Sequence, residues 1–140
     1  MEKLAPEYLA EIGRQIAALS AFLGGFAATF LGTLLATRSR KWQAGWAAGF
    51  AAVSAASFAV AVIGATMLAV TLHPAAPLRI REAANLGPAR VIAVLAFLVG
   101  MYAMLASLGL SGWIRSRRLG SVTTLAAAMA TAIATWSVSR

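Results

Sequence analysis

The sequence predicts an all-α integral membrane protein with four transmembrane helices arranged as two helical hairpins. Three observations lead to this prediction. Hydrophobic residues make up 61% of the 140 residues, whereas charged residues make up only 11%. The charges gather in short clusters that separate long uncharged stretches. Four of these stretches reach the length of about 20 apolar residues that is needed to cross a hydrocarbon core roughly 30 Å thick.

The four predicted spans contain no Asp, Glu, Lys, Arg or His. Their approximate limits are residues 16–37, 44–72, 91–114 and 119–138. Because an α-helix rises about 1.5 Å per residue, the second span is longer than a bilayer requires, and we expect it to tilt or to project into water. Residues 1–140 are expected to form a single membrane domain.

Residues 1–15 are predicted to form a short amphipathic lead-in to the first span. Pro6 followed by Glu7 is typical of a helix start, because proline needs no amide partner there and a carboxylate favours the positive end of the helix dipole. An apolar stripe through Leu9 and Ile12 continues toward the first span. The acidic residues of this segment replace the positive start of a signal peptide, so we expect it to be retained.

Two tight connections, between spans one and two and between spans three and four, carry nearly the same basic sequence and must lie on one side. Lys and Arg divide equally between the two sides, but all four acidic residues fall on the side of the termini. Since the positive-inside rule weights dense basic residues in short loops, we place the turns in the cytoplasm and the termini outside a bacterial inner membrane. The turns also supply the candidate contacts to anionic lipid: Arg38, Arg40, Lys41, Arg115, Arg117 and Arg118.

Small residues recur on the faces of all four spans. In the first span they recur every four positions from residue 24 to residue 36, and in the second span they include Ala48, Ala52 and Ala56. Such residues let helix backbones approach closely in lipid, either within one chain or between copies. The candidates for helix packing are Gly24, Ala28, Ala36, Gly64 and Gly100.

A line of acidic, small and hydroxyl-bearing residues shares one narrow sector of the first helix, which advances about 100° per residue. One interpretation is a cation path in a homo-oligomer, with carboxylates at its mouth. The alternative is a packing seam whose glutamates are solvated and pair with Arg14, Arg79 or Arg81. The candidate pore-lining residues are Glu7, Glu11, Gly25, Thr29 and Gly32.

Several functions lack the residues that they need. The chain has no cysteine and a single histidine, His73, whereas a metal site needs several such ligands, so we expect no metal and no cofactor. The absence of an ionisable residue from the spans disfavours a proton-coupled exporter. Without a nucleophile and base pair, a carboxylate dyad or a phosphate-binding loop, we expect no enzyme. Charges confined to the ends of the spans argue against nucleic-acid binding.

Two functions remain open. The first is a homo-oligomeric ion channel or pore that prefers cations, which the small and hydroxyl-lined helix faces favour. The second is a non-catalytic accessory or scaffolding subunit of a larger membrane complex, which the same faces and the lack of site chemistry favour. The expected partners are the lipid bilayer, including anionic lipid, and either further copies of the chain or other membrane subunits.

Overall fold

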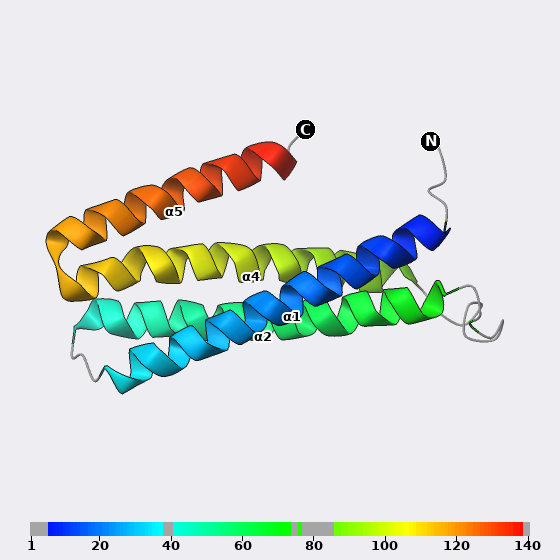
Figure 1. Cartoon of the computed structure of the whole chain (residues 1–140), viewed down its shortest axis with the longest axis horizontal. Helices are drawn as coiled ribbons and strands as arrows, with labels where there is room; N and C mark the ends of the chain where they lie inside the picture. The colour runs from blue at the N-terminus through cyan, green and yellow to red at the C-terminus, as the bar shows by residue number, and fades with distance from the viewer. Residues whose placement is uncertain (1–5, 38–40, 74–75, 77–85, 139–140) are drawn as a thin grey trace.

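Four long helices make up the part of the chain that the structure describes. The structure is a computed structural model that describes residues 6–37, 41–73, 76 and 86–138. The helices are α1 (Pro6–Ala36), α2 (Trp42–Thr71), α4 (Leu86–Arg115) and α5 (Arg117–Val138) (Figure 1). No strand occurs within the described ranges, and the all-helical prediction is confirmed.

Three of these helices are long and apolar enough to cross a lipid bilayer. Among the described residues, the qualifying stretches are Ala10–Ala36, Trp42–Thr71 and Gly87–Ile114. Large apolar side chains also cover the outside of the bundle; Phe22, for example, is 74% exposed. Lipid suits such a surface better than water does, because large contiguous apolar patches are rare on soluble proteins. These features indicate a multi-pass membrane protein.

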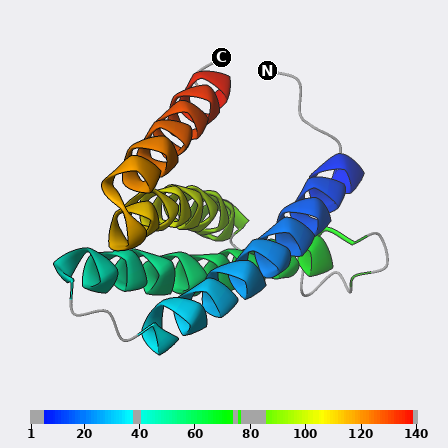
Figure 2. The same ribbon diagram turned by 60° about the vertical axis from the view of Figure 1, so that its left-hand side comes forward.

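The helices form an open array rather than a closed bundle. α2 packs most extensively against α4, α1 packs against α2, and α5 packs against α4. α1 and α5 are the outer helices of the array (Figures 1 and 2). The end of α1, the start of α2 and the α4–α5 turn lie at one end of the molecule, and the starts of α1 and α4 lie at the other (Figure 1). The central pair, α2 and α4, therefore joins the two predicted hairpins.

The packed faces repeat at alternating steps of three and four residues. The buried residues of α2 are Ala44, Ala47, Ala51, Ser54, Phe58, Ala61 and Ala65. On α4, the buried positions Ala93, Gly100, Ala103 and Ser107 have the same spacing. A repeat of 3.5 residues is typical of helices that cross at about +20° in a left-handed sense. Because most of these side chains are small, the helix backbones approach closely.

The described part of the predicted lead-in, residues 6–15, and the first span form one continuous helix; residues 1–5 lie outside the described residues. α1 runs from Pro6 to Ala36, and its buried residues Ala10, Gly13, Ser20 and Ala27 fall on both sides of the predicted boundary. At Gly13, a Cβ atom would lie 3.2 Å from the carbonyl oxygen of Ala65 on α2. The lead-in is thus packed against α2, and the absence of a side chain at Gly13 allows this close approach.

Candidate functional site

The outward face of α1 carries the predicted lane, which we define as Gly25, Thr29 and Gly32. All three residues are exposed, and a Cβ atom added at Gly25 or Gly32 would meet no described atom within 4 Å other than the adjacent residues and backbone of α1 itself. Gly24, the neighbour of Gly25, lies against α2, where its Cβ position is 3.2 Å from Cβ of Phe58. The lane therefore faces away from α2, and its small residues leave room for a further helix or for lipid.

The hydroxyl of Thr29 is oriented by its own helix. Its Oγ1 donates a hydrogen bond to the carbonyl oxygen of Gly25 at 2.9 Å, one turn earlier. A hydroxyl has one proton to donate and two lone pairs that accept. With the proton directed to the backbone, the oxygen presents its lone pairs outward, where they suit a cation or a hydrogen-bond donor.

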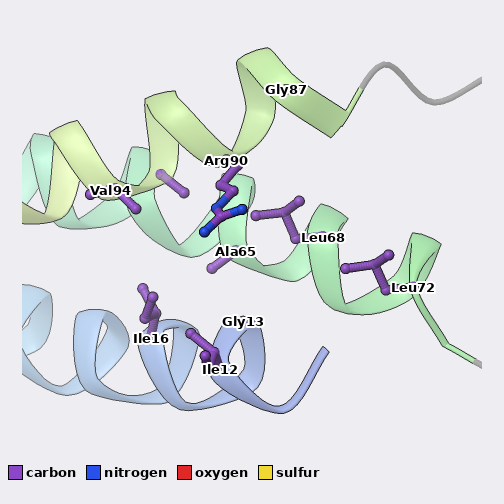
Figure 3. A pocket seen from close by; sticks show the side chains of 10 residues that line it. Ile12, Gly13, Ile16, Ala65, Leu68, Leu72, Gly87, Arg90 and Val94 are labelled. Carbon is purple, nitrogen blue, oxygen red and sulfur yellow. The ribbon is translucent and has the colours of Figure 1, made fainter. Parts of the chain in front are cut away.

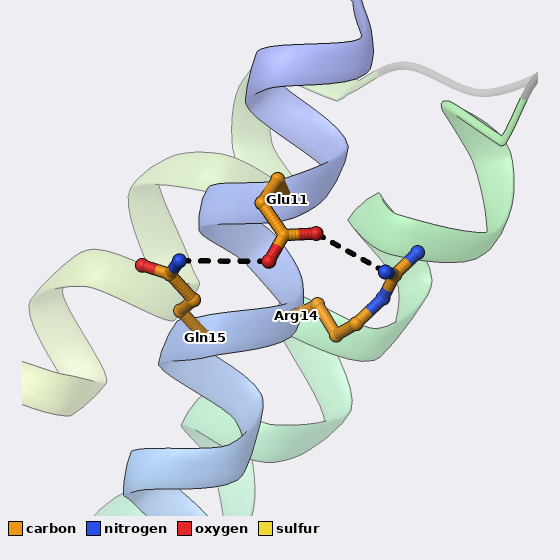
Figure 4. Close-up of polar contacts among 3 residues, drawn as sticks. All are labelled: Glu11, Arg14 and Gln15. Carbon is orange, nitrogen blue, oxygen red and sulfur yellow. Dashed lines mark hydrogen bonds and ion pairs between the residues drawn. The ribbon is translucent and has the colours of Figure 1, made fainter.

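Glu11, at the predicted acidic mouth of the lane, pairs with a cation of its own helix. Glu11 Oε2 lies 3.1 Å from a guanidinium nitrogen of Arg14, and Gln15 donates a hydrogen bond to Glu11 Oε1 at 3.5 Å (Figure 4). The two charged side chains are 52% and 65% exposed, so the pair contributes at most about 1 kcal/mol. Glu7 belongs to the first turn of the same helix. The pairing of Glu11 with Arg14 is the alternative that the sequence predicts.

The residues predicted to pack helices divide into two groups. Gly24, Gly64 and Gly100 lie at helix contacts: Gly64 faces Ala93 at 3.0 Å, and Gly100 faces the ring of Phe58 at 3.0 Å, both measured from the Cβ position. Ala28 and Ala36 are exposed on α1. In the four-residue repeat of α1, Gly24 thus packs against α2, whereas Ala28 and Ala36 face outward.

The basic end of the molecule holds part of the predicted lipid-binding cluster. Lys41 donates a hydrogen bond from Nζ to the carbonyl oxygen of Ile114 at 2.7 Å, at the negative end of the α4 dipole. This contact connects the start of α2 to the end of α4. Arg117 and Arg118 are exposed in the first turn of α5, and Arg115 is the last residue of α4. Arg38 and Arg40 lie outside the described residues.

Sequence reasoning missed two features. Arg90 lines a cleft between α1, α2 and α4, although the predicted third span begins only at residue 91. One pattern in the sequence could have indicated this role of Arg90. It is a cation in the second turn of a helix whose first turn carries no acidic residue, although the positive end of the helix dipole disfavours a cation there. The second feature is a pair of buried hydroxyls: Ser54 donates to the Gly100 carbonyl at 2.8 Å, and Ser107 donates to the Ala47 carbonyl at 2.7 Å.

No candidate metal centre occurs among the described residues. They include no group of three or more His, Cys, Asp or Glu side chains that could hold a metal ion. The chain matches no protein-family model, and no curated protein or solved structure is significantly similar to it. The interpretation of function therefore rests on the faces of the helices.

Proposed function

We propose that the chain crosses a bacterial inner membrane four times, as two helical hairpins, with the tight basic turns in the cytoplasm. The pattern of α5 supports the fourth span. Thr123 on α5 donates a hydrogen bond to the Gly109 carbonyl on α4 at 3.1 Å, so a polar side chain faces protein. A helix lying on the membrane surface would instead turn its polar face to water. The outward residues of α5 are apolar and at least 60% exposed: Val122, Leu125, Met129, Ile133 and Trp136.

We propose that copies of the chain assemble through the α1 lane and form a cation-preferring channel or pore. The observation that carries this proposal is the outward Thr29 hydroxyl. It lies between two glycines, Gly25 and Gly32, whose Cβ positions contact no described residue of another helix within 4 Å. The core of one copy is filled by alanine, serine and Phe58, so a path is expected between copies rather than inside one. Around an axis, the glycines permit close approach and the hydroxyl oxygens replace part of a cation's hydration.

The first test compares variants of Thr29 in liposome flux and in oligomer mass. Thr29→Leu should reduce cation flux strongly, because a larger apolar side chain fills the lane, while the oligomer persists. Thr29→Val keeps the shape and removes the oxygen, so it should also reduce flux. Thr66→Val, at an exposed threonine of α2, is the matched control and should conduct like the original chain. If all three variants conduct equally, the lane is not the path.

The second test concerns assembly. Gly25→Leu should reduce the oligomer to a single chain, because the added side chain separates the helices. Gly49→Leu is the control, since Gly49 on α2 is also exposed and has no atom within 4 Å of its Cβ position. The mass in nanodiscs distinguishes the two. Equal effects of the two variants would show that bulk alone, and not the lane, disturbs the protein.

One observation favours the second function, an accessory subunit of a larger membrane complex. Arg14 offsets the charge of Glu11, so this carboxylate of the predicted mouth is not free to attract ions. In that case the lane receives a helix from a different protein. A purified chain that stays monomeric and conducts no ions, while a co-expressed membrane protein binds the unmodified lane and not the Gly25→Leu variant, would favour this function.

A further inference from the structure

A cleft between α1, α2 and α4 combines apolar walls with one cation. Its volume is about 280 Å³, and it lies near the starts of α1 and α4 (Figure 3). The Arg90 guanidinium points from α4 toward α2 (Figure 3). The larger apolar side chains that line the cleft are Ile12 and Ile16 of α1, Leu68 and Leu72 of α2, and Val94 of α4.

The charge of Arg90 lacks compensation from the described part of the chain. There, Arg90 makes no hydrogen bond and no ion pair, and the first turn of α4 contains no acidic residue. Arg90 also lies near the positive end of the α4 dipole, where a cation is unfavourable and an anion is favourable. A bound anion in the cleft would compensate the charge of Arg90 and would interact favourably with the positive end of the helix dipole. The guanidinium would donate to it in a bidentate manner.

The depth of Arg90 identifies the kind of anion. α4 has 30 residues and is therefore about 45 Å long, some 15 Å longer than a hydrocarbon core of about 30 Å. Arg90 lies four residues, or about 6 Å, from the first residue of α4. That position corresponds to the boundary between headgroups and acyl chains. A membrane-spanning chain meets lipid phosphates at this depth.

We propose that the cleft binds one anionic phospholipid, with its phosphate on Arg90 and the beginning of one acyl chain against the apolar wall. The volume of the cleft is slightly below the roughly 300–1,000 Å³ of typical ligand pockets, so only the part of the lipid next to the phosphate enters. The rest of the lipid lies along the outside of α1 and α4. This site is at the opposite end of the molecule from the basic turns.

The experiment measures lipid retained by the purified full chain in native mass spectra, after exposure to equal amounts of phosphatidylglycerol and phosphatidylcholine. The original chain should retain one phosphatidylglycerol in preference to phosphatidylcholine. Arg90→Gln should weaken this retention about tenfold or more, because it removes charge-assisted hydrogen bonds. Arg90→Lys should retain part of it, since lysine keeps the charge but loses the bidentate geometry.

Two controls separate the cleft from general charge effects. Arg14→Gln removes the same charge from α1, outside the lining of the cleft, and should leave retention unchanged. Arg117→Gln together with Arg118→Gln, at the other end, should weaken only lipid bound at the basic turns, and Arg90→Gln added to this background should still remove one phosphatidylglycerol. If Arg14→Gln loses as much phosphatidylglycerol as Arg90→Gln does, or if Arg90→Gln removes none in that background, the cleft is not a specific site.

A third variant tests the acyl part of the proposal. Val94→Trp should fill the cleft while Arg90 stays in place, because Val94 is exposed and lines the cleft rather than the core. It should reduce retention of phosphatidylglycerol, and an excess of inorganic phosphate should not displace the lipid. Unchanged retention in Val94→Trp, or displacement by phosphate alone, would overturn the lipid proposal. Helical content and the melting temperature, measured for every variant, exclude loss of fold as the cause.

Discussion

Phe58 fills the space between three helices at the centre of the array. It has no exposed surface, its Cβ lies 3.2 Å from the Cβ position of Gly24 on α1, and its ring lies 3.0 Å from that of Gly100 on α4. The ring also contacts Phe97 edge-on, with ring centroids 5.9 Å apart. Two glycines thus form a recess for one aromatic side chain.

Phe58→Ala is expected to lower the free energy of unfolding by about 3–5 kcal/mol, because the packing contacts are lost and a cavity remains. Phe22→Ala is the matched control: it removes the same atoms from a side chain that is 74% exposed, and it should cost little. Unfolding by sodium dodecyl sulfate in mixed micelles, followed by circular dichroism, provides the measurement. Similar losses in the two variants would contradict the central role of Phe58.

The Glu11–Arg14 pair predicts opposite effects of two neutral substitutions, if the lane conducts. Glu11→Gln leaves Arg14 unpaired at the mouth and should lower the preference for cations, whereas Arg14→Gln frees the carboxylate and should raise it. Both effects should be larger near 0.01 M salt, where the Debye length is about 30 Å, than near 0.1 M, where it is about 10 Å. Reversal potentials of the reconstituted chain report the preference. A shift in the same direction for both variants would disprove this account.

At the scale of single residues, the sequence predicts local pairs and misses distant ones. Glu11 and Arg14 are three positions apart on one helix, so their pairing follows from helical geometry. Arg90 lines one cleft together with Ile12 and Leu68 only because three helices converge. Sequence periodicity carries no information on that convergence, and a cation just outside a predicted span has the pattern of an ordinary interfacial residue.

The helices themselves follow from the sequence, but their packed faces follow only in part. The predicted spans lie close to the observed helices because length and hydropathy determine both. The small residues predicted for the second span include Ala61 and Ala65, which are buried, but also Ala48, Ala52 and Ala56, which are not. The buried face there passes through Ala51 and Ser54 instead. In an alanine-rich helix every face is small, so composition alone does not select the face that is packed.

Reciprocal hydroxyls hold the central helix pair together. Ser54 of α2 donates to a carbonyl of α4, and Ser107 of α4 donates to a carbonyl of α2. Ser54→Ala and Ser107→Ala should each lower the free energy of unfolding by about 0.6 kcal/mol, and by no more than about 1.7 kcal/mol. Ser121→Ala should have almost no effect, because its hydroxyl bonds within α5, to the Arg117 carbonyl. The same micelle titration measures all three, and an equal cost at Ser121 would show that the interhelical bonds are not special.

At the scale of the whole molecule, the order of the helices leaves the two outer ones without a common partner. α1 contacts mainly α2, and α5 contacts mainly α4, so each exposes a long outward face. Both faces carry large exposed apolar residues, such as Phe22 on α1 and Leu125 on α5, and α1 adds the small residues of the lane. Lipid suits the large side chains, and the lane is the part of the α1 face that suits a protein neighbour.

The topology prediction is that α5 crosses the membrane. The helix has 22 residues and is about 33 Å long, which is sufficient for a hydrocarbon core of about 30 Å. α5 is also attached along its length, because Tyr102 and Thr135 share a hydrogen bond of 2.9 Å and Trp113 donates to Thr124 at 2.9 Å. Since α4 runs through the bilayer, a helix that packs along it in this way is expected to cross as well.

Cysteine labelling from one side of sealed vesicles tests whether α5 crosses the membrane. A cysteine at Ser116, in the α4–α5 turn, should react from the same side as one at Thr37, at the end of α1, because both lie at the basic end of the molecule. A cysteine at Ser139, after α5, should react from the opposite side, together with one at Ala84. Reagent that reaches Ser116 and Ser139 from one side would place α5 on the membrane surface. The chain would then have three spans and no second hairpin. The α1 lane and the Arg90 cleft would be unaffected, since neither includes a residue of α5.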